Sequence, residues 1–101
     1  MTRERKIVHV VIKGRVQGVG YRAWMQMEAY RLGISGWVRN RFNGDVEALF
    51  AGPPDAVESL CAACWRGPSQ SRVTGVFVED ASEAELALPR VKSGFHQMPT
   101  R

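Results

Sequence analysis

The sequence predicts an α+β sandwich in which two helices cover one face of an antiparallel sheet. Three observations lead to this prediction. Residues 7–13 alternate as a half-buried strand does, two stretches beginning near Tyr21 and Pro54 have the composition of helices, and an Asn43-Gly44 pair separates two strand-like runs. In chain order the segments read β, α, β, β, α, β.

The length and composition fit one domain. The chain has 101 residues, of which 45% are hydrophobic and 24% charged, so we expect a single domain over residues 1–101 with a folded core at about 7–97. The apolar run Ile7–Ile12 is too short for a signal-peptide core or a membrane span. We therefore expect a cytoplasmic protein that has no membrane partner and is by default a monomer.

The sequence indicates one buried face for the first strand but two candidate buried faces for the first helix. Val8, Val10 and Ile12 share one face of the strand predicted at 7–13. Residues 21–32 are good helix formers, and Gly33 ends the helix. Two stripes compete for its buried face, one of Tyr21, Met25, Ala29 and Leu32 and one of Ala23, Met27 and Tyr30.

A hairpin and a second helix follow. The strand-like runs 36–40 and 45–51 are joined by 41–44, where the Asn-Gly pair tolerates the positive φ that tight turns demand. Gly52-Pro53-Pro54-Asp55 begins the second helix with proline in its first turn, and Gly67-Pro68 ends it.

Residues 73–79 predict another strand, 81–89 an acidic surface connection, and about 90–97 a weak final strand. With two right-handed crossover connections, this order folds most simply into a ferredoxin-like sandwich. The first and third strands are then central, and both helices lie on one face of the sheet.

Cys61 and Cys64 form a CxxC pair, which can indicate a redox or metal site. A zinc site needs about four ligands, and no second pair of this kind is present. Val57, Leu60, Cys61 and Cys64 instead have the spacing of a buried helical stripe, where free cysteine acts as a small hydrophobe. We expect both cysteines in the core and no metal site.

The loop GRVQGVGYR, Gly14 to Arg22, leaves a strand and enters a helix, and this makes it a candidate anion site. The guanidinium of Arg22 could donate two hydrogen bonds to phosphate oxygens, in a bidentate arrangement. Because G-K-[ST] is absent, a nucleotide-binding loop with magnesium is disfavoured. Residues 1–41 hold nine basic and two acidic side chains (+7), and the remainder five and eight (−3), so positive charge surrounds the loop. The alternative is a solvated basic surface.

Two motifs resemble the signatures of a known family. Ile12 to Arg22, IKGRVQGVGYR, is similar to the first signature of acylphosphatases, and Gly36 to Asn40, GWVRN, followed by Gly44, Val46 and Gly52, is similar to the second. The resemblance spans roughly residues 7–80 and implies the ferredoxin-like fold. It also implies hydrolysis of small acyl phosphates without a cofactor, with inorganic phosphate or other anions as product or inhibitor. Tyr21 departs from the usual phenylalanine, and GFHQMPT fits the family's last strand loosely.

The resemblance also implies roles for individual residues. Arg22 would bind phosphate, and the amide of Asn40 would orient the attacking water. The backbone N–H groups of the loop would cradle the phosphoryl oxygens, from Val16, Gln17, Gly18, Val19, Gly20 and Tyr21. Because a carboxylate is a good leaving group, positioning and charge stabilisation suffice. The proton of the water can pass to the phosphate, so no histidine is required. The motif leaves the acyl group open among acetyl, carbamoyl and glyceroyl.

Two rival functions use the same fold. An RNA-binding module would place stacking aromatic residues on the first and third strands, where Phe50 is the only aromatic residue, so we expect no nucleic-acid partner. A protein-interaction domain with an idle phosphate loop is the other rival. Competitive phosphate binding without turnover would indicate it.

Overall fold

The computed structural model describes residues 4–87 and 94–101. The predicted order β, α, β, β, α, β is confirmed, the weak final strand is present in part as a fifth strand, and a short helix that was not predicted precedes it. The strands are β1 (Lys6–Arg15), β2 (Ser35–Asn40), β3 (Val46–Gly52), β4 (Arg72–Asp80) and β5 (Phe95–Gln97), and the helices are α1 (Tyr21–Leu32), α2 (Pro54–Cys64) and α3 (Glu83–Ala87).

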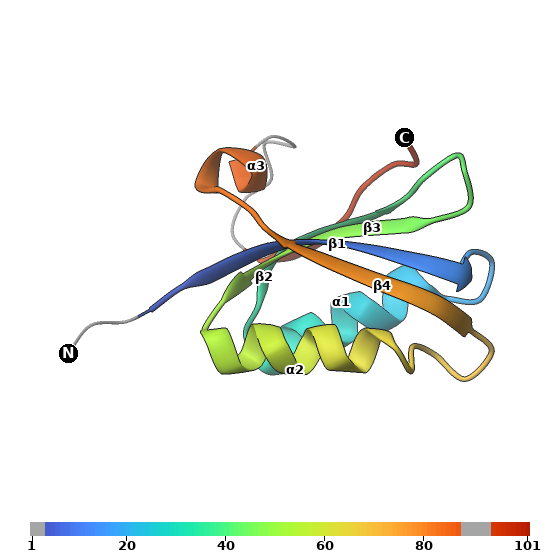
Figure 1. Cartoon of the computed structure of the whole chain (residues 1–101), viewed down its shortest axis with the longest axis horizontal. Helices are drawn as coiled ribbons and strands as arrows, with labels where there is room; N and C mark the ends of the chain where they lie inside the picture. The colour runs from blue at the N-terminus through green and yellow to red at the C-terminus, as the bar shows by residue number, and fades with distance from the viewer. Residues whose placement is uncertain (1–3, 88–93) are drawn as a thin grey trace.

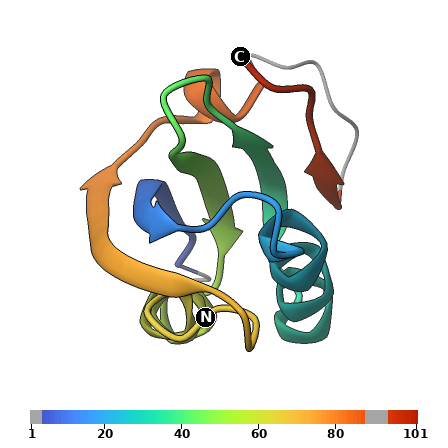
Figure 2. The same ribbon diagram turned by 90° about the vertical axis from the view of Figure 1, so that its right-hand side faces the viewer.

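The five strands form one sheet in the order β4-β1-β3-β2-β5. As predicted, β1 and β3 are interior strands, and α1 and α2 lie together on one face of the sheet, while α3 lies on the other (Figures 1 and 2). One pairing differs from the predicted antiparallel sheet. β5 runs parallel to β2, with Gly36 opposite Phe95, and the sheet is therefore mixed.

The core lies between the sheet and the two long helices. Val8, Val10 and Ile12 of β1 are at most 1% exposed, as the alternation of the strand predicted. The structure also decides between the two stripes of α1. Met27 and Tyr30 are 73% and 85% exposed, whereas the other stripe faces the sheet, with Tyr21, Met25 and Ala29 buried and Leu32 packed against the core.

Both cysteines of the CxxC pair lie in or against the core. Cys64 is buried and Cys61 is half-buried, and both are free thiols. Burial raises the pKa of Cys64 to about 12, and burial also raises the pKa of Cys61. Since the thiolate is the reactive form of cysteine, these environments disfavour redox chemistry and fit the packing role expected from the sequence.

The region after β4 differs from the predicted acidic connection because it contains α3. Ser82 Oγ accepts a hydrogen bond from the Glu85 N–H at 3.3 Å, and Glu83 and Glu85 lie in the first turn of the helix. The Ser-x-x-Glu spacing is a capping signal that indicates a helix start. Of the final strand predicted at about 90–97, the structure shows Phe95–Gln97, and residues 90–93 lie outside the described residues. Within the described ranges, no helix is long and apolar enough to cross a membrane.

Candidate active site

The loop between β1 and α1 is anchored in the core at Val16 and has open space beside two of its glycines. Val16 is 1% exposed and belongs to the core. Gly18 and Gly20 have φ values of 72° and 79°, in the left-handed region that favours glycine. A Cβ atom at either position would meet no other atom within 4 Å. The backbone conformation therefore favours glycine here, while the space beside the two glycines stays open.

The first turn of α1 presents N–H groups that no side chain caps. Gly20 is the N-cap residue, and the first helical hydrogen bond runs from the Trp24 N–H to the Gly20 oxygen at 3.0 Å. The turn contains no acidic residue. The N–H groups before Trp24 and the positive end of the helix dipole can therefore attract an anion.

A pocket of about 150 Å³ lies where this loop meets α1 and the end of β2. It brings together Arg22 and Asn40, which the sequence motifs placed in different elements. The lining residues are Val16, Gly18, Gly20, Tyr21, Arg22, Ala23, Asn40 and Gln97.

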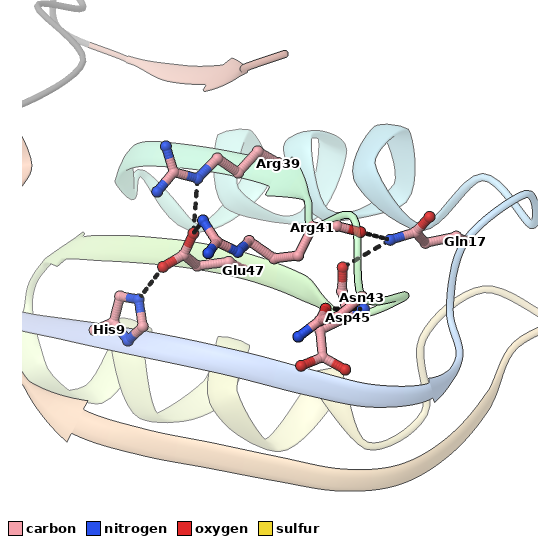
Figure 3. Close-up of polar contacts among 7 residues, drawn as sticks. All are labelled: His9, Gln17, Arg39, Arg41, Asn43, Asp45 and Glu47. Atoms are coloured by element: carbon pink, nitrogen blue, oxygen red, sulfur yellow. Dashed lines mark hydrogen bonds and ion pairs between the residues drawn. The ribbon is translucent and has the colours of Figure 1, made fainter. Parts of the chain in front are cut away.

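Two loop residues of the predicted cradle do not line the pocket. Val19 packs against the core. Gln17 turns its side chain toward the β2–β3 hairpin, where its Nε2 donates to the Arg41 oxygen at 2.7 Å and to the Asp45 oxygen at 2.9 Å (Figure 3). The predicted roles of Val19 and Gln17 concern their backbone N–H groups and remain predictions.

Arg22 is half-buried and has no hydrogen-bond or ion-pair partner among the described residues. Three other basic residues of the first part of the chain, Lys13, Arg39 and Arg41, are paired. Lys13 Nζ lies 2.7 Å from Asp45 Oδ2, and Glu47 accepts from Arg39 at 2.7 Å and from Arg41 at 3.4 Å. Part of the positive charge seen in the first part of the sequence is thus neutralised locally, and the charge of Arg22 remains available at the pocket.

Asn40 is the last residue of β2 and is half-buried. Its backbone is fixed on both sides, because the residue pairs with Val46 of β3 and its oxygen accepts from the Arg101 N–H at 3.0 Å. Its side-chain amide has no hydrogen-bond partner within the described part of the chain. A fixed backbone therefore presents an amide that can both donate and accept at the pocket.

Gln97 lines the pocket from β5 and was missed by the sequence analysis. Its Nε2 donates to Gln26 Oε1 at 2.8 Å, and Gln26 Nε2 in turn donates to the Phe95 oxygen at 2.9 Å. This chain of two amides links α1 to β5. Nothing in the local sequence marks it, because only the pairing of β5 with β2 brings Gln97 to the site.

Tyr21 combines a place in the pocket wall with a packing role. It is 2% exposed, its ring packs edge-on against Trp24, and its hydroxyl donates to the Cys64 oxygen at 2.5 Å. Burial raises the pKa of Tyr21, so the phenol stays protonated and can donate this hydrogen bond. The tyrosine thus ties the start of α1 to the end of α2.

Two further observations bear on alternative sites. Among residues 4–87 and 94–101, no group of three His, Cys, Asp or Glu side chains could hold a metal ion. Phe50, the aromatic residue that a nucleic-acid surface would need on β3, is 0% exposed and faces the core. It therefore cannot stack on a base.

Comparison with known proteins gives a consistent match. The acylphosphatase family model matches residues 8–96. A protein of Bradyrhizobium diazoefficiens named acylphosphatase is 52% identical over 96 residues, covering 95% of this chain and 97% of its own length. One of Nitrobacter hamburgensis with the same name is 54% identical over 93 residues, covering 90% of this chain and 92% of its own length.

Solved structures of two bacterial proteins described as acylphosphatases have the same fold. The one from Coxiella burnetii has a TM-score of 0.84 and 32% identity, and it covers 97% of this chain and 100% of its own. The one from Bacillus subtilis has a TM-score of 0.81 and 36% identity, and it covers 91% and 97%.

Proposed function

The chain belongs to the acylphosphatase family and is an acylphosphatase, and on that premise we propose that its catalytic site is the pocket shared by Arg22 and Asn40. The observation that carries the proposal is that one pocket joins the uncapped start of α1 with an arginine and an amide that have no side-chain partner among the described residues. Each of these groups suits one part of the hydrolysis of an acyl phosphate.

The phosphoryl group binds at the loop and the start of α1. The backbone N–H groups from Val16 to Tyr21 donate to its oxygens, and the guanidinium of Arg22 neutralises its charge. Inorganic phosphate, the product, binds the same donors and is a competitive inhibitor. Since Arg22 has no competing carboxylate among the described residues, its full charge acts on the ligand.

Asn40 holds the attacking water opposite the leaving group. Its amide oxygen accepts a hydrogen bond from the water, and its N–H group can donate to a phosphoryl oxygen. The water oxygen forms a bond to phosphorus as the bond from phosphorus to the acyl oxygen breaks. The bonding electron pair leaves with the carboxylate, and the proton of the water passes to a phosphate oxygen.

No metal or general base is needed in this scheme. The carboxylate leaves readily, so the barrier is lowered mainly by orientation and by charge stabilisation in the transition state. These are the contributions that a pre-formed loop, a guanidinium and a fixed amide supply. The proposed site does not specify which small acyl group is cleaved, because the donors on the loop bind the phosphoryl group.

Hydrolysis of acetyl phosphate and benzoyl phosphate by the purified protein tests the proposal. We expect the same rate with and without excess EDTA. Arg22→Ala and Asn40→Ala should each lower kcat/KM by about 10²-fold or more, as the loss of a transition-state donor does. Arg15→Ala is the matched control, since Arg15 is exposed and does not line the pocket.

Two results would contradict the proposal. Normal turnover in both Arg22→Ala and Asn40→Ala would show that the pocket takes no part in the reaction. Loss of activity in EDTA, restored by magnesium, would overturn the metal-free scheme.

A further inference from the structure

The side chain of Gln17 connects the two halves of the proposed site. The residue belongs to the phosphate loop, yet its Nε2 donates to the oxygens of Arg41 and Asp45, at 2.7 and 2.9 Å (Figure 3). Both oxygens belong to the β2–β3 hairpin, and Arg41 directly follows Asn40. Both hydrogen bonds are partly buried. One amide group therefore sets the position of the loop relative to the residue beside Asn40.

The hairpin turn has hydrogen bonds of its own. The Arg41 N–H donates to the Asp45 oxygen at 2.8 Å, and the Gly44 N–H donates to the Arg41 oxygen at 3.1 Å. The Asp45 N–H donates to Asn43 Oδ1 at 3.0 Å. Each carbonyl contacted by Gln17 thus already has one donor and offers its second lone pair. The turn can form without Gln17, so the amide mainly determines where the loop lies relative to it.

We propose that Gln17 is a positioning residue that fixes the spacing between the phosphate loop and Asn40. This inference rests on the proposed function and concerns the side chain of Gln17, whereas binding of phosphate uses its backbone. The loop holds phosphorus and Asn40 holds the water. The amide of Gln17 keeps the water in line with the departing acyl oxygen.

The residue type fits this role. The two N–H bonds of one amide nitrogen diverge, so the nitrogen can donate to two neighbouring carbonyls at once. A carboxylate would place negative charge against both oxygens, and asparagine is one methylene too short to reach them from the same backbone position. Displacements of about 1 Å between reacting groups can cost about 10²-fold in rate. A small shift of the loop is therefore enough to slow turnover.

Gln17→Met tests the proposal, because methionine has a similar length and shape but donates no hydrogen bond. We expect kcat to fall by about tenfold or more. The inhibition constant of inorganic phosphate should change by less than about threefold, since the loop N–H groups and Arg22 remain. Gln70→Met is the matched control, as Gln70 is exposed and does not line the pocket. It should leave both constants unchanged.

A double-mutant cycle with Asn40→Ala separates positioning from a general effect on the fold. If Gln17 acts through Asn40, then Gln17→Met should lower kcat by less than about threefold in the Asn40→Ala background. Fully additive losses would overturn the proposal. Wild-type activity of Asn40→Ala alone would instead contradict the proposed function, so the two failures are distinguishable.

Folding of each variant is checked by circular dichroism and by the rise in Tm on adding inorganic phosphate. Gln17→Asn is the second variant, which retains an amide but cannot span the distance, and we expect it to lose kcat as Gln17→Met does. Normal kcat in both variants would overturn the proposal. Failure of both to fold would show a purely structural role and would overturn it as well.

Discussion

His9 Nε2 lies 2.6 Å from Glu47 Oε2, which joins β1 to β3 on the sheet face opposite α1 and α2 (Figure 3). The other carboxylate oxygen of Glu47 accepts from Arg39 Nε at 2.7 Å, and the guanidinium of Arg39 lies 4.7 Å from the ring centre of Trp37. The side chain of Glu47 is only 14% exposed. This carboxylate therefore links three strands across the sheet.

Glu47 should make the stability of the protein depend on pH. Burial raises the pKa of Glu47, but the hydrogen bonds and charges of His9 and Arg39 outweigh burial, so its pKa lies below the ordinary value of 4.5. A carboxyl group with a lowered folded pKa stabilises the fold above its unfolded pKa, and this contribution is lost as the pH falls through the folded value. Glu47→Gln should lower the free energy of unfolding at neutral pH by about 1–2 kcal/mol.

Urea denaturation of the wild type and Glu47→Gln over a range of pH measures this difference. We expect the difference to be present at neutral pH and to shrink as the pH falls below 4.5. A difference of the same size at every pH would mean that Glu47 acts through packing alone. Glu58→Gln is the control, because Glu58 is exposed and has no ion-pair partner among the described residues.

Tyr21→Phe should separate stability from catalysis. The hydroxyl of Tyr21 is buried and donates to the Cys64 oxygen near the end of α2. Its removal leaves a helix-end carbonyl without this donor and should cost about 1 kcal/mol. For a domain of this size, Tm should then fall by about 4–8 °C. The ring stays in place, so kcat should change by less than about twofold. A large loss of kcat at normal stability would contradict the prediction that the hydroxyl contributes to stability alone.

The sequence predicted those parts of the fold that local patterns determine. The helix formers from Tyr21 and the stop at Gly33 place α1 correctly, because both ends depend on nearby residues. The choice between its two apolar stripes could not be made locally, since only the packed sheet exposes Met27 and Tyr30. The segment α3 was missed although Ser82 and Glu85 mark its start.

The site shows the same division between local and long-range information. The paired signatures predicted that Arg22 and Asn40 act together, and one pocket does contain both. The side-chain partners of Gln17 lie 24 and 28 residues away, and Gln97 reaches the pocket only through the parallel pairing of a three-residue strand. The hydrophobic periodicity of the sequence does not predict such contacts, because they depend on how the strands associate.

Gln97 should influence which acyl group the enzyme prefers. Its carboxamide forms a polar part of the pocket wall and is oriented by Gln26. Gln97→Leu should raise the ratio of kcat/KM for benzoyl phosphate to that for acetyl phosphate by several-fold, because an apolar wall favours the larger apolar group. The inhibition constant of phosphate should not change. An unchanged ratio would show that the acyl group does not contact this wall.

Arg101→Pro should test whether the backbone position of Asn40 limits turnover. The Arg101 N–H donates to the Asn40 oxygen at 3.0 Å, next to a second link from the Met98 N–H to the Val38 oxygen at 2.8 Å. Proline has no N–H group, so the substitution removes the contact with Asn40 and leaves the one from Met98. A hydrogen bond of this kind contributes about 1 kcal/mol.

If that contact holds Asn40 in its working position, Arg101→Pro should lower kcat by about two- to fivefold and leave the inhibition constant of phosphate unchanged. Arg101→Ala is the matched control, since it removes the same side chain and retains the N–H group. It should behave as the wild type. Equal losses in both variants would assign the effect to the arginine side chain, and no loss in either would mean that pairing with Val46 of β3 is sufficient to position Asn40.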